Sequence, residues 1–399
     1  EMGSKLNKTV FVGVSGGVDS SVSAALLKDQ GYDVVGVFIR TWQPEFIECT
    51  WRDERRDAMR VCAHLDIPFL ECDAEEAYKK GVADYMIEEY KKGNTPNPDV
   101  MCNREVKFGV FWNFAKAHGA DYIATGHYAR VLRSESSSQS SLTPSRKERD
   151  GTPPPVAFQG LSELHKGNDE SKDQSYFLWT LTQDDLSHTL FPIGHLQKSQ
   201  VRKLAEKFGL PTAEKKDSQG VCFLGPLDMK EFLAHYIKPV RGDVLNEKGE
   251  IVGYHNGVVF FTLGERHGFT ITKHSTKNLP LYVVAKDIEK NIIIVSQNKN
   301  FTAKDTDNSL LGISSARPSR PAQVLSQQDS CFTLKNINWI SDIPKENKKY
   351  TAQIRYHGEQ LPCRFKNTSI TFDRPVLASL GQSIVVYDGD ICLGGGIVE

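Results

Sequence analysis

The segment that most constrains the fold is a short glycine turn between an apolar run and a helical run. Residues 9–14 are largely apolar, residues 15–21 read Ser-Gly-Gly-Val-Asp-Ser-Ser, and residues 22–27 are again mostly apolar. Glycine permits positive φ and lets the backbone approach a ligand closely, and the free N–H groups at a helix start favour an anion. The order strand, turn, helix therefore predicts a polyphosphate-binding loop. No lysine closes the turn, so it differs from the Gly-x-x-x-x-Gly-Lys loop of γ-phosphate transfer.

Strand-like and helix-like patterns alternate through the first half of the chain. Further strands are expected at 34–39, 69–72 and 122–125, and a helix at 55–65. Such alternation indicates parallel βαβ units with the ligand at the carboxyl ends of the strands. The sequence therefore predicts a doubly wound α/β domain over residues 1–238.

Composition and periodicity change in the rest of the chain. Residues 134–155 are dense in Ser and Pro, which predicts a flexible insertion, more readily a tolerated surface loop than a regulatory segment. Beyond the first domain the pattern becomes alternating, with strands expected within 258–266 and 281–284. We expect a small β-rich central domain over 239–300.

The last hundred residues contain short strand patterns separated by turn signals. Residues 308–330 are polar with two Arg-Pro steps and read as an interdomain linker. The Asp388-Gly389 pair predicts a hairpin turn between the last two strands. Residues 301–399 are therefore expected to form this linker and a C-terminal β-barrel.

Composition narrows the class of protein. A chain of 399 residues with 39% hydrophobic residues is long enough for two or three packed domains. A net charge of −1 argues against strong non-specific nucleic-acid binding, so a nucleic-acid enzyme of this type must gather its basic residues locally. The eight cysteines include no Cys-x-x-Cys pair, which argues against a structural zinc site.

The expected location is the cytoplasm, without membrane association. No run of 18 apolar residues occurs, and the N-terminus shows neither a signal-peptide core nor an Arg-rich transit pattern. Glu1 precedes Met2, and Gly3-Ser4 follows, so these first residues look like an appended end. An organellar leader therefore stays open as an alternative.

Five segments carry a resemblance to a known family. Segments 95–108 and 215–225 each contain a cysteine and resemble fingerprints of the tRNA-specific 2-thiouridylases. Segments 124–130, 172–178 and 392–397 match the same family in the same order. The resemblance covers nearly the whole chain.

The resemblance implies an ATP-dependent tRNA sulfurtransferase. Such an enzyme adenylates O2 of the wobble uridine and replaces this oxygen with sulfur, giving 2-thiouridine. Cys222 matches the persulfide carrier, Cys102 its partner nucleophile, and Asp99 the acid or base. Two cysteines suit this reaction, because the thiolate of the second can attack the persulfide of the first. This attack either releases sulfide or closes a disulfide. An iron–sulfur cluster held by these three residues ranks below the persulfide route and is not excluded.

The resemblance also implies the ligand contacts. The turn resembles the PP-loop of ATP pyrophosphatases (adenine nucleotide alpha hydrolase-like), and it implies ATP with Mg²⁺. The implied nucleotide contacts are Gly13, Val14, Ser15, Gly16, Gly17, Val18, Asp19, Ser20, Ile39 and Gly126. The implied tRNA contacts are Asn97, Pro98, Asp99, His127, Lys172, Asp173, Gln174, Arg355, Tyr356 and Gln382. No metal ligands are expected.

The implied partners are a tRNA with a wobble uridine and a persulfide donor, either a cysteine desulfurase or a sulfur-relay protein, and the chain is expected to be a monomer. Two other functions stay open. An amidating PP-loop ligase would need ammonia or an amine rather than two cysteines. A non-catalytic tRNA-binding protein would not need Asp19, Asp99, Cys102 and Cys222 to be intact.

Overall fold

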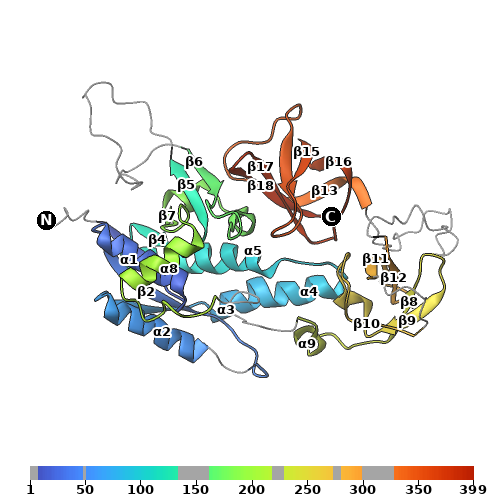
Figure 1. The fold of residues 1–399 in the computed structure, drawn as a ribbon, viewed down its shortest axis with the longest axis horizontal. Coiled ribbons are helices and arrows are strands. Elements are labelled where there is room, and N and C mark those ends of the chain that lie inside the picture. The colour runs from blue at the N-terminus through green and yellow to red at the C-terminus, as the bar shows by residue number, and fades with distance from the viewer. Residues whose placement is uncertain (1–7, 48–50, 134–160, 218–228, 273–279, 299–327) are drawn as a thin grey trace.

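A computed structural model of the chain describes residues 8–47, 51–133, 161–217, 229–272, 280–298 and 328–399 (Figure 1). The expected insertion at 134–155, most of the expected linker at 308–330, and Cys222 lie outside these ranges. The described chain forms a parallel sheet with its helices, a small central sheet and a C-terminal barrel (Figure 1).

The N-terminal sheet is parallel and has the strand order β3-β2-β1-β4-β7. Its strands are β1 (Thr9–Gly13), β2 (Asp33–Arg40), β3 (Phe69–Asp73), β4 (Tyr122–Ala124) and β7 (Thr189–Leu190). The first four are the strands predicted from the sequence. Since the order reverses at β1, the carboxyl end of β1 is the topological switch point where such sheets bind ligands.

Helices cover both faces of this sheet, which confirms the doubly wound prediction. Val10 and Val12 face a core formed with α1 (Val18–Asp29) and α2 (Trp51–His64). Phe11, between them, faces the opposite core. Strands buried on both faces carry apolar residues at consecutive positions, as β1 does.

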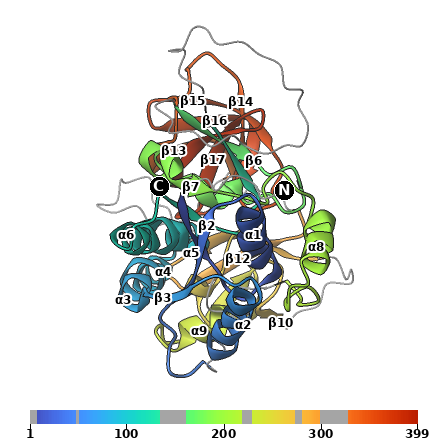
Figure 2. The same ribbon diagram turned by 90° about the vertical axis from the view of Figure 1, so that its left-hand side faces the viewer.

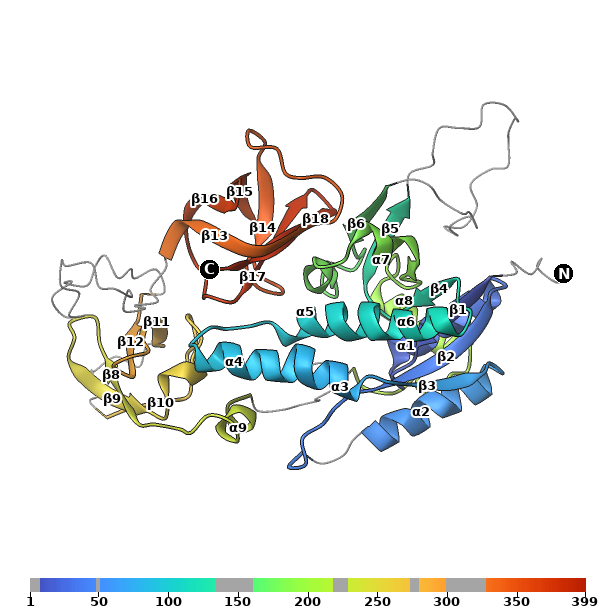
Figure 3. The ribbon, with the colours of Figure 1, turned by 180° about the vertical axis from the view of Figure 1, so that it is seen from behind.

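The second core is built on two long helical rods that lie side by side (Figure 3). One rod consists of α3 (Glu75–Tyr78), the π-helical η1 (Lys79–Asp84) and α4 (Tyr85–Lys91). The other consists of α5 (Pro98–Cys102), the π-helical η2 (Asn103–Val110) and α6 (Phe111–Ala117). The rods touch at Gly81, where a Cβ atom would stand 2.8 Å from Cγ of Glu105. No helix in the described ranges is long and apolar enough to cross a bilayer.

Shorter elements complete the first domain. They are the strands β5 (Ala129–Arg133) and β6 (Ser162–Lys166), the 3₁₀-helix η3 (Ser175–Leu178), and the helices α7 (Gln183–Ser187), α8 (Lys198–Lys207) and α9 (Met229–Ala234). Helix α8 packs beside α1 (Figure 2) through an apolar cluster that includes Val22 and Val201.

The central domain is a five-stranded sheet with the order β10-β9-β8-β12-β11. Its strands are β8 (Gly242–Leu245), β9 (Ile251–His255), β10 (Phe269–Ile271), β11 (Tyr282–Asp287) and β12 (Ile292–Ser296). The strand expected within 258–266 is wrong, because Val258–Phe260 forms the 3₁₀-helix η4. Gly257, at φ +138°, turns the chain there, and the Val258 amide donates to Oδ1 of Asn291 at 3.0 Å. The apolar residues of this segment therefore enter the core of the central domain from a bend and not from a strand.

The C-terminal barrel that the sequence predicted is present and has six strands. They are β13 (Gln328–Trp339), β14 (Tyr350–Gln353), β15 (Leu361–Lys366), β16 (Ser369–Leu377), β17 (Ser383–Asp388) and β18 (Ile391–Val398). The pairing of β13 with β18 closes the barrel. The hairpin turn at Asp388-Gly389 is confirmed, with Gly389 at φ +61°. Because β13 begins at Gln328, the end of the expected linker is strand.

The first domain extends the sheet of the barrel. Strands β5 and β6 form a hairpin whose β6 pairs antiparallel with β18, with His165 opposite Ile391. The Lys166 amide also donates to the Asp390 carbonyl at 2.9 Å. This continuous sheet fixes the barrel against the first domain.

A buried lysine joins the central domain to the connection between α4 and α5. The Lys286 side chain donates to the Gly93 carbonyl at 2.9 Å and to the Phe261 carbonyl at 2.6 Å. Burial lowers the pKa of Lys286 from 10.5 to about 8, although Glu265 acts to raise it. The ammonium group is thus retained at neutral pH at a cost in desolvation.

We predict that this cost appears in the pH dependence of stability. Above pH 8 the folded chain loses the Lys286 proton while the unfolded chain keeps it up to about pH 10.5, so stability rises with pH across that window. Relative to Lys286→Met, the free energy of unfolding of the wild type should rise by at most about 3 kcal/mol. Urea unfolding at pH 7.5, 9 and 10.5 measures the difference, and parallel curves for the two proteins would contradict it.

Candidate active site

The glycine turn lies at the carboxyl end of β1, as predicted. Helix α1 begins at Val18 behind Gly17, which provides no side-chain cap for the first amides of the helix. The Ser15 amide donates to Oγ of Ser20 at 3.2 Å, and Oγ of Ser21 donates to the Gly17 carbonyl at 2.7 Å. The turn is thereby closed on itself, with the N-terminal amides of α1 at the switch point of the sheet.

Two glycines are required by close packing around this turn. Gly16 has φ +72°, and a Cβ atom there would stand 2.6 Å from the Glu54 carbonyl oxygen. Gly126, just after β4, lies against the turn, and its Cβ would stand 2.7 Å from the Ser20 amide nitrogen. The predicted contact residue Ile39 is buried, and its Cδ1 would be 3.6 Å from a Cβ at Gly13. The turn, Ile39 and Gly126 therefore lie together.

The Asp19 carboxylate is held by two groups from other elements. The Tyr128 hydroxyl donates to Oδ1 of Asp19 at 2.8 Å. The Lys198 ammonium group donates to both carboxylate oxygens, at 2.8 and 2.9 Å. Burial and the Asp19 charge raise the pKa of Tyr128, which keeps its hydroxyl protonated.

A second carboxylate, Asp217, shares the same lysine. Lys198 lies 2.8 Å from Oδ1 of Asp217, Arg202 lies 2.6 Å from the same oxygen, and Lys172 lies 2.9 Å from Oδ2. Partial burial acts to raise the pKa of Asp217, but the hydrogen bonds and charges of Lys198 and Lys172 outweigh it and lower the pKa to about 2. Asp217 is therefore ionised at neutral pH.

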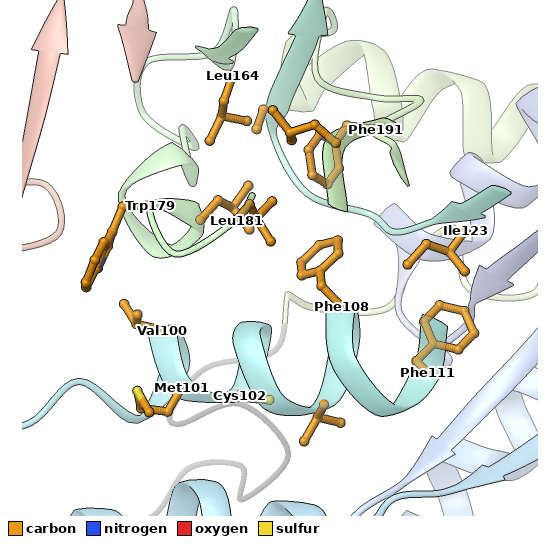
Figure 4. Packing of buried hydrophobic residues seen from close by; sticks show 14 of the residues in the cluster. Val100, Met101, Cys102, Phe108, Phe111, Ile123, Leu164, Trp179, Leu181 and Phe191 are labelled. Atoms are coloured by element: carbon orange, nitrogen blue, oxygen red, sulfur yellow. The ribbon is translucent and has the colours of Figure 1, made fainter. Parts of the chain in front are cut away.

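Helix α5 positions the predicted catalytic pair Asp99 and Cys102. Asn97 caps the helix, since its Oδ1 accepts from the Asp99 amide at 3.1 Å and from the Val100 amide at 3.2 Å. Pro98 occupies the first turn, where its missing N–H costs nothing. Asp99 is half-buried. Cys102, the last residue of α5, is only 1% exposed and lies in the apolar core (Figure 4).

The segment 172–174 is braced by hydrogen bonds within the protein. Asp173 accepts from the Gly167 amide at 2.9 Å and from the Ser175 hydroxyl at 2.9 Å, and its burial raises its pKa. Oε1 of Gln174 accepts from the Tyr128 amide at 3.0 Å. These two predicted tRNA contacts therefore also shape the loop that precedes η3.

His127 is buried in the structure, although the resemblance implies a tRNA contact at this position. It is 6% exposed, its Nδ1 lies 2.7 Å from Oγ1 of Thr125, and its ring centroid lies 6.0 Å from that of Phe108 and 5.8 Å from that of Phe191. Burial, with a smaller contribution from Lys107, lowers the pKa of His127 well below 6.5. The ring is therefore neutral at physiological pH.

The barrel contributes the turn after β14. Arg355 is exposed, and the ring of Tyr356 lies 4.4 Å from that of Phe177 in η3. Burial raises the pKa of Tyr356 to about 12, and the charges of Asp173 and Asp99 add to the effect. Gln382 braces its own loop, where its Oε1 accepts from the Ser379 amide at 2.8 Å.

The structure thus brings three distant segments together. Tyr176 of η3 is hydrogen-bonded to Asn97, the cap of α5, and the ring of Tyr356 on the barrel turn lies 4.4 Å from that of Phe177 in η3. Cys222 lies outside the described residues, so its distance from Cys102 is not defined. Within the described ranges, no group of three His, Cys, Asp or Glu side chains is arranged to hold a metal ion. The cluster alternative involving Cys222 is not tested by this observation.

Sequence reasoning missed three residues of the site. Lys198 is 179 positions from Asp19, and no local pattern connects them. Tyr128 lies inside a quoted family segment, but its contact with Asp19 has no signal in the sequence. Phe177, also inside such a segment, contacts the Tyr356 ring only because the barrel folds back onto η3.

Comparison with known proteins gives a consistent result over the whole chain. Three family models match: the tRNA methyl transferase HUP domain over residues 8–226, the tRNA methyl transferase PRC-barrel domain over 230–297, and the aminomethyltransferase beta-barrel domain over 329–398. The tRNA-specific 2-thiouridylase MnmA of Streptococcus thermophilus (strain ATCC BAA-491 / LMD-9) is 39% identical over 98% of this chain and 95% of its own length. That of Bacillus subtilis (strain 168) is 41% identical over 98% of this chain and 94% of its own length.

The chain shows a weak likeness to one solved thiolase structure. The U34-tRNA thiolase NcsA from Methanococcus maripaludis, with its 4Fe-4S cluster, is 16% identical and has a TM-score of 0.33 over 58% of this chain and 65% of that chain. At this TM-score the likeness supports no conclusion about the function of this chain.

The burial of Cys102 predicts slow alkylation of the ligand-free protein. Because its side chain is 1% exposed, we expect iodoacetamide to modify Cys102 at least about ten times more slowly than the exposed Cys331. Cys363, which is buried and whose pKa burial raises to about 12, serves as a slow reference. Peptide mass spectrometry over time measures each rate, and equal rates at Cys102 and Cys331 would contradict the buried position.

Proposed function

Because the chain belongs to the family of tRNA-specific 2-thiouridylases, we propose that it replaces O2 of the wobble uridine with sulfur carried by Cys222. The reaction class is ATP-dependent thiolation of a tRNA uridine. The observation that best supports the proposed site is the meeting of α5, the segment before η3 and the barrel turn at Tyr356. This place offers a carboxylate, a buried thiol and aromatic rings to one nucleotide.

The nucleotide side of the proposal rests on the turn after β1. The close contacts at Gly16 and Gly126 hold the turn tightly against its protein neighbours, so the uncapped amides at the start of α1 keep a fixed position in which they can bind a polyphosphate. ATP would lie over residues 13–20 with Mg²⁺ as its counter-ion. Ile39 and Gly126 would flank the nucleoside. Uridine O2 would attack the α-phosphorus, releasing pyrophosphate and leaving AMP on the base.

The proposed sulfur transfer uses both cysteines. The terminal sulfur of the Cys222 persulfide forms a bond to C2 of the adenylated uridine, and AMP leaves. The Cys102 thiolate then attacks Sγ of Cys222, and the electron pair of the broken S–S bond stays on the sulfur attached to C2. The products are 2-thiouridine and a Cys102–Cys222 disulfide, which a dithiol reductant must reopen. Asp99 would act as the acid or base beside the base edge.

The tRNA side would use both domains. The wobble base must leave its stack to reach a buried thiol, as base-modifying enzymes require. Asn97, Pro98 and His127 would line its pocket, with Lys172, Asp173 and Gln174 beside the anticodon loop. Arg355, Tyr356 and Gln382 would contact the tRNA from the barrel. The half-buried Tyr356 ring offers a stacking surface, and the exposed Arg355 offers a charge for phosphate.

Further features of the proposal concern partners and organisation. A cysteine desulfurase or a sulfur-relay protein would load Cys222. We propose a cytoplasmic monomer of bacterial type, in which residues 1–238 form the catalytic domain, 239–300 the central domain, and 301–399 the linker and barrel.

Substitution of the two cysteines tests the reaction. We predict that Cys102→Ser and Cys222→Ser each abolish 2-thiouridine formation but keep ATP-to-pyrophosphate exchange, since adenylation precedes sulfur transfer. Nucleoside mass spectrometry of tRNA incubated with ATP, Mg²⁺ and a cysteine desulfurase measures the product, with Cys331→Ser as the matched control. Wild-type turnover without reductant should leave a Cys102–Cys222 disulfide. Full thiolation by either variant would overturn the two-cysteine route and favour a different route for the sulfur.

Substitution on the barrel tests the tRNA contact. We predict that Arg355→Ala weakens binding to every substrate tRNA, lowers the slope of log K against log[salt] by about one, and leaves ATP affinity unchanged. The control is Arg374→Ala, because Arg374 is exposed on the same barrel and pairs with Glu359 at 2.6 Å. Filter binding over a salt series measures both variants. A salt-independent affinity in the wild type would count against nucleic acid as the substrate.

A further inference from the structure

The glycine turn at residues 15–21 contains no lysine, but the ammonium group of Lys198 lies beside it. Lys198 is the first residue of α8, and its ammonium group is 2.8 and 2.9 Å from the two carboxylate oxygens of Asp19, the second residue of α1. The Lys198 side chain is 15% exposed, so its charge is partly desolvated and keeps some access to solvent. Figures 1 and 2 agree in placing α8 alongside α1.

The surroundings of Lys198 fix its position from three sides. Its backbone amide donates to Oδ2 of Asp169 at 2.8 Å, which fixes the start of α8. Asp217 holds the ammonium group at 2.8 Å and also binds Arg202 and Lys172. Asp19, Asp169 and Asp217 carry three negative charges, which balance the three positive charges of Lys172, Lys198 and Arg202. This ion cluster lies next to the N-terminus of α1.

The cluster is not needed to attach α8 to the domain. Val201 and Ala205 of α8 already pack against Val18 and Val22 of α1 in a buried apolar cluster. Ion pairs that are partly desolvated add little net stability, because the cost of removing water offsets the attraction. A lysine aimed at the loop above such an apolar contact is better explained by a ligand than by helix packing.

We propose that Lys198 is a phosphate-binding residue of the nucleotide site and supplies from α8 the cation that the loop lacks. The proposal rests on the proposed use of ATP. A polyphosphate over Gly17 and Ser20 would carry more negative charge than the Asp19 carboxylate and would attract the ammonium group more strongly. The Lys198 ammonium group would then contact the polyphosphate, while Asp169 keeps the start of α8 in place through the Lys198 backbone amide.

The proposal predicts a selective loss of affinity for the polyphosphate. With Lys198→Met, the Kd of a non-hydrolysable ATP analogue with Mg²⁺ should rise at least about tenfold, whereas the Kd of AMP should stay within about twofold of the wild-type value. Lys198→Arg should keep most of the wild-type affinity for the analogue, because arginine keeps the positive charge. Lys203→Met is the matched control, since Lys203 is exposed on the same helix, and it should bind the analogue as the wild type does.

Isothermal titration of the full chain measures these constants, and melting temperatures report on folding. If Lys198→Met does not fold, Lys198→Gln replaces it, because glutamine keeps a hydrogen-bond donor for Asp19. The same changes in Kd are expected for this variant. Equal affinity of the variant and the wild type for the analogue, or equal weakening of the analogue and AMP, would overturn the role of Lys198. A wild type that binds neither nucleotide would instead overturn the proposed function.

Discussion

A buried tyrosine hydroxyl group joins the cap of α5 to the C-terminal barrel. The Tyr176 hydroxyl lies 2.9 Å from the Ser383 carbonyl oxygen and 3.1 Å from that of Ile354, so its one proton is shared between two barrel carbonyls. Asn97, the cap of α5, is a further hydrogen-bond partner of Tyr176. Burial raises the pKa of Tyr176, so this donor is kept over the whole physiological range. The cap of α5, η3 and the barrel are therefore linked through one side chain, which adds to the hydrogen bond between Ser175 and Tyr387 and to the pairing of β6 with β18.

The site has two chemically different sides. At the end of β1, uncapped amides, close-packed glycines and an ion cluster around Asp19 suit a polyphosphate. At α5, a half-buried carboxylate, a thiol in an apolar core and the adjacent rings of Phe177 and Tyr356 suit a nucleobase. Both sides are built on the first domain, since η2 and α6 continue α5 directly onto the parallel sheet. The arrangement fits a reaction in which the nucleotide and the base must meet at one atom.

Local patterns in the sequence predicted most of the regular structure. The strands at 34–39, 69–72 and 122–125 were predicted correctly because their apolar residues are buried or partly buried against the cores on the two faces of the sheet. The run at 258–266 was misread because apolar content alone does not distinguish a strand from a bend that fills a core, and Gly257 decides between them. Contacts such as Lys198 with Asp19 could not be predicted, since an ion pair between distant residues leaves no periodic signal. The site of Cys222 stays a prediction.

The pairing of β6 with β18 has a consequence for how the chain folds during synthesis. Lys166 of β6 donates to the Gly389 carbonyl, beside the start of β18, at 3.0 Å, and these residues are 223 positions apart. At ribosomal speeds of about 5–20 residues per second, the β5–β6 hairpin leaves the ribosome roughly ten to fifty seconds before its partner strand exists. During that interval the β6 edge has unpaired amides and carbonyls and resembles the edges at which nascent chains associate wrongly. Completion of the first domain therefore depends on the last strand that the ribosome releases.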